Sequence, residues 1–538
     1  MTERSERPNF LVFITDQQRA DHVGCYGNKL VRTPNIDALA ARGTRFDKFY
    51  VSTPICMPNR STMMTGRVPS LHGVRQNGQS LSLQATTFTH LLSAAGWRTA
   101  LFGKSHLQNI TNAAIKDGLS KPDPAKTQPP ARMAEAKIGH GLDGRYDQET
   151  GELWRADQDF DIELPFYGFE TAKLAIGHGD NAHGHYARFL ERKHPGSQAL
   201  RGAANALPSK HKYSVPQAWK TAIPEELYPT NWVADETIGY LRDHAQHNAG
   251  KPFFVQCSFP DPHHPFTPPG KYFDMYDPAD IPTPAAFHHP HNKVLPHLRA
   301  LHEERDAGQT PKSGPTVFGA TERWVKEAIA LTYGSIAMID EAIGRVLASL
   351  AGLGLDKNTI VVFMSDHGDF MGDHQLLFKG ALHYQSLVRT PFIWVDPLEP
   401  RERAVCDALC GTIDLSTTVL DRAGVAAFNG MQGGNLLDYA RTNTGNDAVL
   451  IEDDVRKKYM GFPSNYRVRS LVTRHHRLTL YSNAQWGELY DLANDPNEFD
   501  NLWESPAHQS LRASLTEQLA YKMMQMADSS PLSTGHGP

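Results

Sequence analysis

Four short runs of apolar residues, each followed by charged or polar side chains, constrain the fold of this chain most strongly. They occupy residues 9–16, 99–102, 251–258 and 359–365. Short apolar runs bounded by polar residues are typical of strands that are buried on both faces of a parallel sheet. Helical patterns separate them, at 33–43, 87–96 and 321–350. The sequence therefore predicts an α/β fold with a mostly parallel central sheet sandwiched by helices.

The rest of the chain predicts a smaller second unit and two insertions. Residues 1–440 are expected to form the α/β domain, because strand and helix patterns alternate over this range. The patterns weaken at about 108–225 and 267–320, and we interpret these segments as insertions over the functional face of the sheet. Beyond residue 440, strand-like segments and a final helical pattern predict a small antiparallel α+β subdomain over 441–538.

Composition and charge argue against several classes of partner. The 538 residues carry a formal net charge of −5, which gives no attraction to nucleic acid or to an anionic membrane. No apolar run approaches the roughly 20 residues that span a bilayer, and the polar N-terminus has no signal-peptide core. We therefore expect a cytoplasmic protein with neither nucleic acid nor membrane as a partner. The sequence leaves the oligomeric state open, and a homo-oligomer is among the states that it allows.

Residues 53–66 contain the most specific motif of the chain, a Cys-x-Pro-x-Arg pattern closed by Thr65-Gly66. Pro58 suits the first turn of a helix, where its missing N–H costs nothing. The positive end of that helix would then point at Cys56, and Arg60 would add a fixed cation. These surroundings favour a reactive cysteine with a lowered pKa over an inert structural one.

Further polar groups follow the predicted strands, and the carboxyl ends of parallel strands meet at one edge of a sheet. Each group alone has an ordinary explanation as a helix cap, a turn residue or a solvated side chain. Together they offer mainly oxygen ligands with one imidazole, which suits Ca²⁺, Mn²⁺ or Mg²⁺ better than a structural Zn²⁺ site. The groups are Asp16-Gln17, Lys104-x-His106, His263, Asp366-His367 and Lys379.

These motifs resemble those of the type I sulfatases, within the alkaline phosphatase superfamily, and the resemblance spans most of the chain. The matching segments are 9–27, 56–66, 103–107, 365–380 and 489–502. In that family the cysteine is oxidised to formylglycine (3-oxoalanine) by a formylglycine-generating enzyme. The resemblance implies one bound divalent cation with Asp16, Gln17, Cys56, Asp366 and His367 as metal ligands. It implies that the catalytic residues are Cys56, Arg60, Lys104, His106, His263 and Lys379.

The resemblance also implies a role for each catalytic side chain around the hydrated aldehyde, which would be the nucleophile. Arg60 and Lys104 would stabilise the hydrate and the sulfate oxygens. His263 and Lys379 would contact the sulfate and help to protonate the leaving oxygen. His106 would take the proton from the second hydroxyl, so that the sulfate hemiacetal collapses to aldehyde and sulfate. A covalent route of this kind splits one difficult step into two easier ones.

Two residues depart from the pattern of many calcium-dependent sulfatases and keep alternatives open. Gln17 stands where a second Asp is common, and His367 where Asn is common. One ligand charge is lost and one nitrogen is gained, so Mn²⁺ rivals Ca²⁺. The same pairs resemble phosphonate monoester hydrolases and choline sulfatases, although those phosphonate hydrolases lack the Lys104-x-His106 pair. We rank sulfate monoester hydrolysis first. Phosphonate monoester or phosphate diester hydrolysis by a promiscuous site comes second, ahead of a non-catalytic protein with unmodified Cys56 and of a two-metal phosphatase or phosphomutase.

The leaving group of the substrate is expected to contact a polar wall formed partly by the first insertion. The residues predicted to bind substrate are Asn77, His178 and Asp180. Their polar character suits a saccharide or another small hydroxylated sulfate ester. A solvated glycine-rich loop at 177–181 is an equally good interpretation of the same residues.

Overall fold

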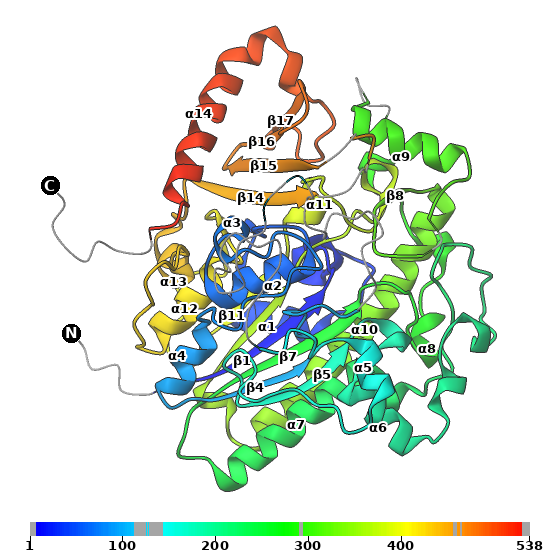
Figure 1. The fold of residues 1–538 in the computed structure, drawn as a ribbon, viewed down its shortest axis with the longest axis vertical. Coiled ribbons are helices and arrows are strands. Elements are labelled where there is room, and N and C mark those ends of the chain that lie inside the picture. The colour runs from blue at the N-terminus through cyan, green and yellow to red at the C-terminus, as the bar shows by residue number, and fades with distance from the viewer. Residues whose placement is uncertain are drawn as a thin grey trace, which may run out of the picture.

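A nine-stranded mixed sheet forms the centre of the computed structural model, which describes residues 7–111, 125, 127, 144–289, 294–311, 313–455, 460–462 and 465–529 (Figure 1). The strand order is β12-β2-β11-β9-β1-β7-β4-β5-β6. The strands are β1 (Asn9–Asp16), β2 (Thr44–Phe46), β4 (Arg98–Gly103), β5 (Thr171–Ile176), β6 (His183–Gly184), β7 (Phe253–Pro262), β9 (Thr359–Ser365), β11 (Phe392–Val395) and β12 (Val405–Cys406).

The five strands β9, β1, β7, β4 and β5 are mutually parallel. Their register brings their carboxyl ends together, because Thr15 pairs with Ser365 and Gly103 pairs with Ser258. The strands β11 and β6 run antiparallel to their neighbours β9 and β5. The predicted mostly parallel sheet is thus confirmed, and polar residues that follow β1, β4, β7 and β9 meet at one edge.

Helices cover both faces of the sheet, and alternate residues of β1 face opposite layers. Phe10, Val12 and Ile14 pack toward a layer that includes α2 (Cys56–Thr65), α4 (Phe88–Ala94) and α12 (Asp414–Arg422). Leu11 and Phe13 pack toward α1 (Pro34–Arg42), α7 (Pro229–His247) and α10 (Glu322–Gly352). Burial on both faces explains why β1 has no exposed residue and reads as a continuous apolar run.

Part of the segment 108–225, which the sequence predicts to be an insertion over the functional face of the sheet, is itself a strand of the central sheet. The strand β5 inside this range pairs with β4 from Ala100 opposite Thr171 to Gly103 opposite Leu174. Lys173 in this strand is exposed, so the strand lacks the continuous apolar run of the buried central strands. The same segment contributes α5 (Gly151–Ala156) and α6 (His185–Lys193), whereas 112–124 and 128–143 lie outside the described residues.

The second predicted insertion contains short elements that pack beside the main sheet. They are α8 (Gly270–Phe273), α9 (Pro296–Asp306) and β8 (Phe318–Gly319), and β8 pairs with β10 (Leu376–Leu377). Other short elements are α3 (Pro69–His72), β3 (Phe49–Tyr50), α11 (Gln385–Val388), β13 (Cys410–Gly411) and α13 (Leu436–Thr442). No helix within the described ranges is long and apolar enough to cross a bilayer.

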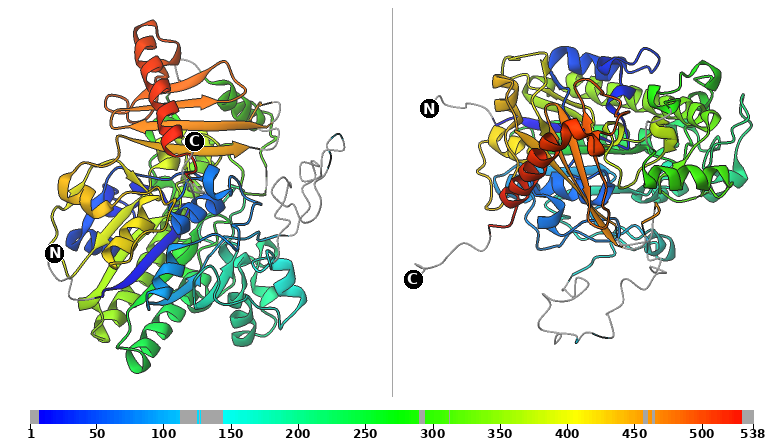
Figure 2. Two further views of the ribbon diagram at one scale, coloured as in Figure 1. Left: turned by 60° about the vertical axis from the view of Figure 1, so that its left-hand side comes forward. Right: turned by 90° about the horizontal axis from the view of Figure 1, so that it is seen from above.

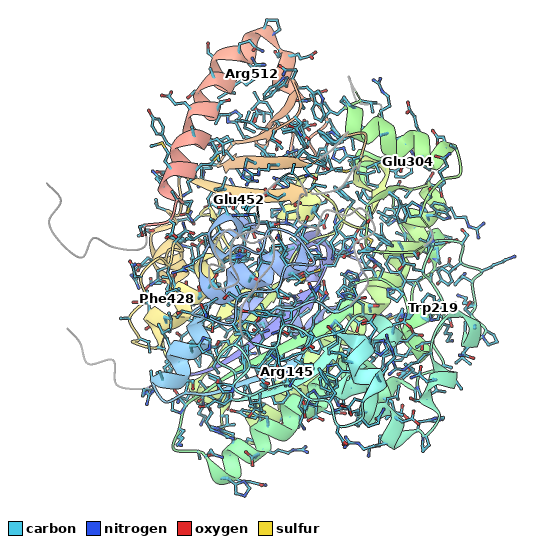
Figure 3. The ribbon with its side chains drawn as sticks, viewed as in Figure 1. Arg145, Trp219, Glu304, Phe428, Glu452 and Arg512 are labelled. Carbon is cyan, nitrogen blue, oxygen red and sulfur yellow. The ribbon has the colours of Figure 1, made fainter. Side chains whose placement is uncertain are left out.

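A four-stranded antiparallel sheet forms the C-terminal part of the fold, as predicted. It contains β14 (Ala448–Val455), β15 (Tyr466–Thr473), β16 (His476–Tyr481) and β17 (Gly487–Asp491) in this order, and α14 (Gln509–Gln525) packs across it (Figure 2). Arg477 of β16 is fully buried, and its guanidinium group lies 2.8 Å from Glu488 and 2.5 Å from Glu498. Glu452 of β14, labelled in Figure 3, accepts a 2.8 Å hydrogen bond from the Ser70 backbone N–H and joins this sheet to α3.

Candidate active site

Cys56 is the first residue of the helix α2, which begins near the carboxyl ends of the parallel strands. Ile55 caps the helix in an extended conformation, and Gly66 ends it with a left-handed φ of 64°. Cys56 is 1% exposed. Asn59, one turn along, donates a 2.5 Å hydrogen bond to the Asp366 carbonyl oxygen and accepts one from the Ser52 N–H at 3.2 Å. The start of the helix is therefore held directly against the end of β9.

Cationic side chains surround the Cys56 thiol. Lys379 Nζ lies 2.8 Å from Sγ, and His367 Nε2 lies 3.1 Å from it. Burial and Asp16 raise the pKa of the thiol, but Lys104, Lys379 and His367 outweigh them, so that its pKa is lowered. A cysteine with a lowered pKa is what the sequence predicts here, and such a thiol is reactive.

Four of the predicted metal ligands converge around this thiol. One donor atom from each of Asp16, Cys56, Asp366 and His367 lies within 4.8 Å of the others, and all four residues are buried. The fifth, Gln17, donates its backbone N–H to Asp366 at 3.0 Å and accepts from Lys379 Nζ through Oε1 at 2.9 Å. Two carboxylates, an amide oxygen and one imidazole form a donor set that fits a hard divalent cation.

Arg60 and Lys104 balance the two buried carboxylates. Arg60 Nε lies 2.8 Å from Asp366, and its Nη1 donates to Ser258 Oγ at 3.0 Å. Lys104 forms an ion pair with Asp16, and although burial opposes this, Lys104 and His263 hold the pKa of Asp16 well below its usual range. Arg60 Nη2 is buried and has no hydrogen-bond partner among the described residues. A donor left free in this way is suited to a bound anion.

His263 and His178 stack on each other beside Lys104. Their ring centroids lie 3.6 Å apart with an interplanar angle of 9°. His178 Nε2 lies 2.6 Å from Lys104 Nζ and 3.3 Å from an Asp16 oxygen. His263 Nε2 is buried without a hydrogen-bond partner in the described part of the chain. Burial, His178 and Lys379 lower the pKa of His263 well below its usual value, so this ring is neutral at neutral pH.

The other predicted substrate-binding residues occupy different surroundings. Asn77 Oδ1 accepts a 3.2 Å hydrogen bond from the Met57 N–H, directly after Cys56. Asp180 is buried, and its Oδ2 accepts from Trp219 Nε1 at 2.7 Å and from the Gly202 N–H at 3.0 Å (Trp219 is labelled in Figure 3). The structure therefore brings Asn77 and His178 to the site, whereas the Asp180 carboxylate supports the loop that carries His178.

Two residues that the sequence reasoning missed support Gln17. Asp369 Oδ2 accepts from Gln17 Nε2 at 2.5 Å, and its Oδ1 accepts from the Phe378 N–H at 2.9 Å. His264 Nδ1 lies 3.2 Å from Gln17 Nε2, and its ring stacks on Phe378 with centroids 3.5 Å apart. The available signals were the position of Asp369 shortly after Asp366 and of His264 directly after His263.

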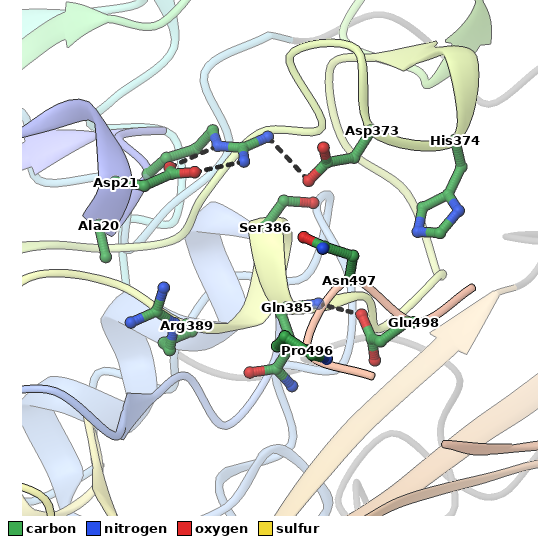
Figure 4. Close-up of a pocket in the computed structure, with 11 residues that line it drawn as sticks. Ala20, Asp21, Asp373, His374, Gln385, Ser386, Arg389, Pro496, Asn497 and Glu498 are labelled. Atoms are coloured by element: carbon green, nitrogen blue, oxygen red, sulfur yellow. Dashed lines mark hydrogen bonds and ion pairs between the residues drawn. The ribbon is translucent and has the colours of Figure 1, made fainter. Parts of the chain in front are cut away.

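A separate polar pocket lies between the segment that follows Lys379 and the C-terminal segment 496–498 (Figure 4). Its lining includes Arg19, which pairs with Asp21 at 2.6 Å and with Asp373 at 3.1 Å. Glu498 Oε2 accepts a 2.7 Å hydrogen bond from the Gln385 N–H. Cys56 and the cationic side chains around it do not line this pocket. The pocket lies where the C-terminal part of the chain meets the segment that carries Lys379.

Comparison with known proteins identifies the family of the chain and relatives with a similar fold. The model of the sulfatase family matches residues 8–425, and that of the C-terminal part of N-sulphoglucosamine sulphohydrolase matches 372–525. An arylsulfatase of Clostridium perfringens is 28% identical over 98% of both chains. A multifunctional alkaline phosphatase superfamily protein of Trinickia caryophylli is 26% identical over 94% of this chain and 93% of its own. The fold is similar to that of a phosphonate monoester hydrolase of Agrobacterium radiobacter, with a TM-score of 0.74 at 23% identity, covering 98% of this chain and 97% of the other.

The cysteine signature on α2, the polar groups that converge from the ends of four parallel strands, and a family match over more than three quarters of the residues therefore lead to one assignment: this chain belongs to the sulfatase family, within the alkaline phosphatase superfamily.

Proposed function

We propose that this sulfatase-family enzyme hydrolyses sulfate monoesters to an alcohol and inorganic sulfate, with Cys56 converted to formylglycine and one divalent cation, Ca²⁺ or Mn²⁺. The observation that carries the proposal is the group of three buried cationic side chains around Cys56. Arg60, Lys104 and Lys379 are each 2–3% exposed. A sulfate ester gains negative charge on its leaving oxygen as the S–O bond breaks, and fixed positive groups in a dry site stabilise that charge.

A free buried donor at the site is suited to a bound anion. Arg60 Nη2 of α2 is buried without a partner within the described ranges. His263 Nδ1 instead donates to the His264 carbonyl oxygen, so the neutral His263 ring presents Nε2 as an acceptor. Unsatisfied buried donors cost free energy unless a ligand pairs with them. A sulfate oxygen is an acceptor that would pair with the N–H of Arg60 Nη2.

The chain supplies distinct proton carriers for the two stages of hydrolysis. Lys379, with its ammonium group beside Cys56, can donate a proton to a leaving oxygen, and His263 could do so only in its protonated form. Burial and Lys104 lower the pKa of His106 well below its usual value, so its ring is neutral and can accept a proton. Asp16, Gln17, Asp366 and His367 would hold the cation. The formylglycine hydroxyl would supply the nucleophile and the cation would supply Lewis acidity.

The substrate class follows from the polar surroundings and from the names of relatives. Asn77 and His178 place an amide and an imidazole beside the site, which suits a hydroxylated leaving group. One relative that is 22% identical is named an N-acetylglucosamine-6-O-sulfatase, from Bacteroides thetaiotaomicron. We propose a small-molecule or saccharide sulfate ester as substrate and a formylglycine-generating enzyme as the maturation partner, in the cytoplasm.

Phosphonate monoester or phosphate diester hydrolysis at the same site is the second candidate. It is favoured by Gln17 and His367, which replace one carboxylate and one amide of many calcium-dependent sulfatases. The Lys104-x-His106 pair favours sulfate esters instead. Both residues are buried, and Lys104 forms an ion pair with Asp16. Because tetrahedral sulfate and phosphonate anions are similar, one cationic site can stabilise both.

Mass spectrometry combined with two substrates tests the proposal. The tryptic peptide 49–60 contains Cys56, and an aldehyde in it would react with a hydrazide where a thiol would not. Hydrolysis of an aryl sulfate is then compared with that of an aryl phosphonate, with Cys56→Ala as the control. An aldehyde with faster sulfate turnover supports the proposal. An aldehyde with faster phosphonate turnover moves the protein to the second candidate, and an unmodified thiol in active protein contradicts the formylglycine mechanism.

A further inference from the structure

The turn that carries Lys104 and His106 is held by a carboxylate from a distant part of the chain. Glu149 is 1% exposed. Its Oε2 accepts from the His106 N–H at 2.7 Å, and its Oε1 accepts from the Leu107 N–H at 2.8 Å and the Gln108 N–H at 2.9 Å. Three consecutive backbone donors on one carboxylate form a charge-assisted cradle, and such bonds are among the strong ones in proteins.

Neighbouring residues also link the turn at 106–108 to the segment that carries Glu149. Gln108 Oε1 accepts from the Gln148 N–H at 2.9 Å, and Gln108 Nε2 donates to Tyr167 Oη at 3.3 Å. Tyr167 in turn donates to the Leu81 carbonyl oxygen at 2.6 Å. Glu149 is thus the centre of a buried network without a counter-charge in this set of contacts. Burial raises the pKa of its carboxyl group, and the hydrogen bonds from the Gln108, His106 and Leu107 N–H groups oppose that rise.

The backbone of this turn matters because it helps to orient His106. The φ of His106 is 58°, in the left-handed region that costs free energy for a residue other than glycine. Its Nδ1 is buried without a partner, and no hydrogen bond to the ring is found among the described residues. A ring without such bonds takes its position from its backbone and packing, and Glu149 binds that backbone directly.

We infer that Glu149 is a positioning residue, which fixes the turn that carries His106 and the nearby Lys104. The inference rests on the proposed function for the role of His106 as proton acceptor. It predicts that Glu149 acts on the stage in which sulfate leaves, without touching the substrate. Misplacement of a catalytic group by about 1 Å costs about 10²-fold in rate, so the effect should appear mainly in kcat.

Kinetics of Glu149→Gln, Glu149→Ala, His106→Ala and the double variant Glu149→Ala/His106→Ala test the inference. Glu149→Gln keeps the volume and one acceptor oxygen, so it guards against failure to fold. We expect Glu149→Ala to lower kcat by about 10²-fold with little change in KM. Release of the alcohol should show a burst before a slower steady state, and the double variant should be no slower than His106→Ala.

Hydrogen–deuterium exchange gives a readout that is independent of activity. In Glu149→Ala the amides of residues 106–108 should exchange faster than in the unchanged protein. Asp340→Asn is the matched control, because Asp340 is also buried and accepts from the Asn35 and Ile36 N–H groups at 3.0 and 2.8 Å, at the start of α1. The control should leave the exchange of 106–108 and the kinetics unchanged.

Unchanged exchange of 106–108 in Glu149→Ala would overturn the inference, and so would an additive loss of rate in the double variant. Failure of the proposed function is distinguishable from this. If the unchanged protein hydrolysed no sulfate ester, the proposed function would fall, while faster exchange in Glu149→Ala would still establish that the carboxylate holds the turn.

Discussion

Removal of the ammonium group of Lys379 tests whether the cations around Cys56 stabilise charge that develops in the reaction. Nζ lies 2.8 Å from Cys56 Sγ, 2.9 Å from Gln17 Oε1 and 3.0 Å from His367 Nε2. At an effective dielectric constant of about 20, a unit charge about 4 Å from a developing unit charge contributes about 4 kcal/mol. Lys379→Met, which keeps the length of the side chain, should therefore lower kcat by about 10³-fold.

Aryl sulfates with leaving groups of different basicity separate the two roles of Lys379. If its ammonium group also helps to protonate the leaving oxygen, the loss should be larger for phenyl sulfate than for 4-nitrophenyl sulfate, because the more basic oxygen needs the proton more. Lys220→Met is the matched control, since Lys220 pairs with Asp274 at 2.6 Å outside the Cys56 cluster. A loss below about tenfold would refute the electrostatic reasoning. An equal loss for both substrates would remove proton donation from the role of Lys379.

The metal ligands, a buried ion pair and a buried carboxyl group give three further expected outcomes. EDTA should abolish turnover, and added Mn²⁺ or Ca²⁺ should restore it. His367→Asn should shift this reactivation toward Ca²⁺, because a nitrogen ligand is lost. Activity that survives EDTA would contradict the single-cation site. Arg477→Met should lower the free energy of unfolding in urea by about 3–5 kcal/mol, because Glu488 and Glu498 lose their buried partner; a loss below about 1 kcal/mol would argue that they are not charged. Burial raises the pKa of Asp261 to about 7, so the folded protein retains a proton that the unfolded chain releases near pH 4, and this group makes stability fall as pH rises between about pH 4 and 7. Asp261→Asn should flatten that part of the urea-derived stability profile, and an unaltered slope would count against the raised pKa.

The central strands could be predicted because their burial leaves a simple record in the sequence. The strand β9 occupies 359–365 as expected, since all of its residues are buried and nearly all are apolar. The strand β5 could not be recognised in the same way, because Lys173 and Thr171 are not buried and its neighbour β6 has only two residues. The pairing of β5 with β4 depends on contacts between segments far apart in the sequence, which composition does not reveal.

The residues of the site also fall into those that could be predicted from the sequence and those that could not. Residues that follow strands or lie in the signature, such as Asp16 and Cys56, could be assigned because the topology of a parallel sheet brings them together. Glu149 and Asp369 could not, since much of their role is to bind backbone N–H groups, which every residue except proline can supply. Asp180 shows the converse case: its polar neighbours suggested contact with substrate, while its carboxylate binds Trp219 and a backbone amide.

The hydrogen bond from the Gln385 N–H to Glu498 has a consequence for how such proteins can recombine. A chain that ended at residue 440 would retain Cys56, Lys379 and the whole nine-stranded sheet, yet it would lose the acceptor for that amide. The segment between Lys379 and Gln385 would then keep only its contacts with residues up to 440. Exchange of C-terminal parts between relatives should therefore preserve activity best where the incoming part brings an equivalent carboxylate. The part of the chain that has to be exchanged together is then larger than the part that carries the catalytic residues.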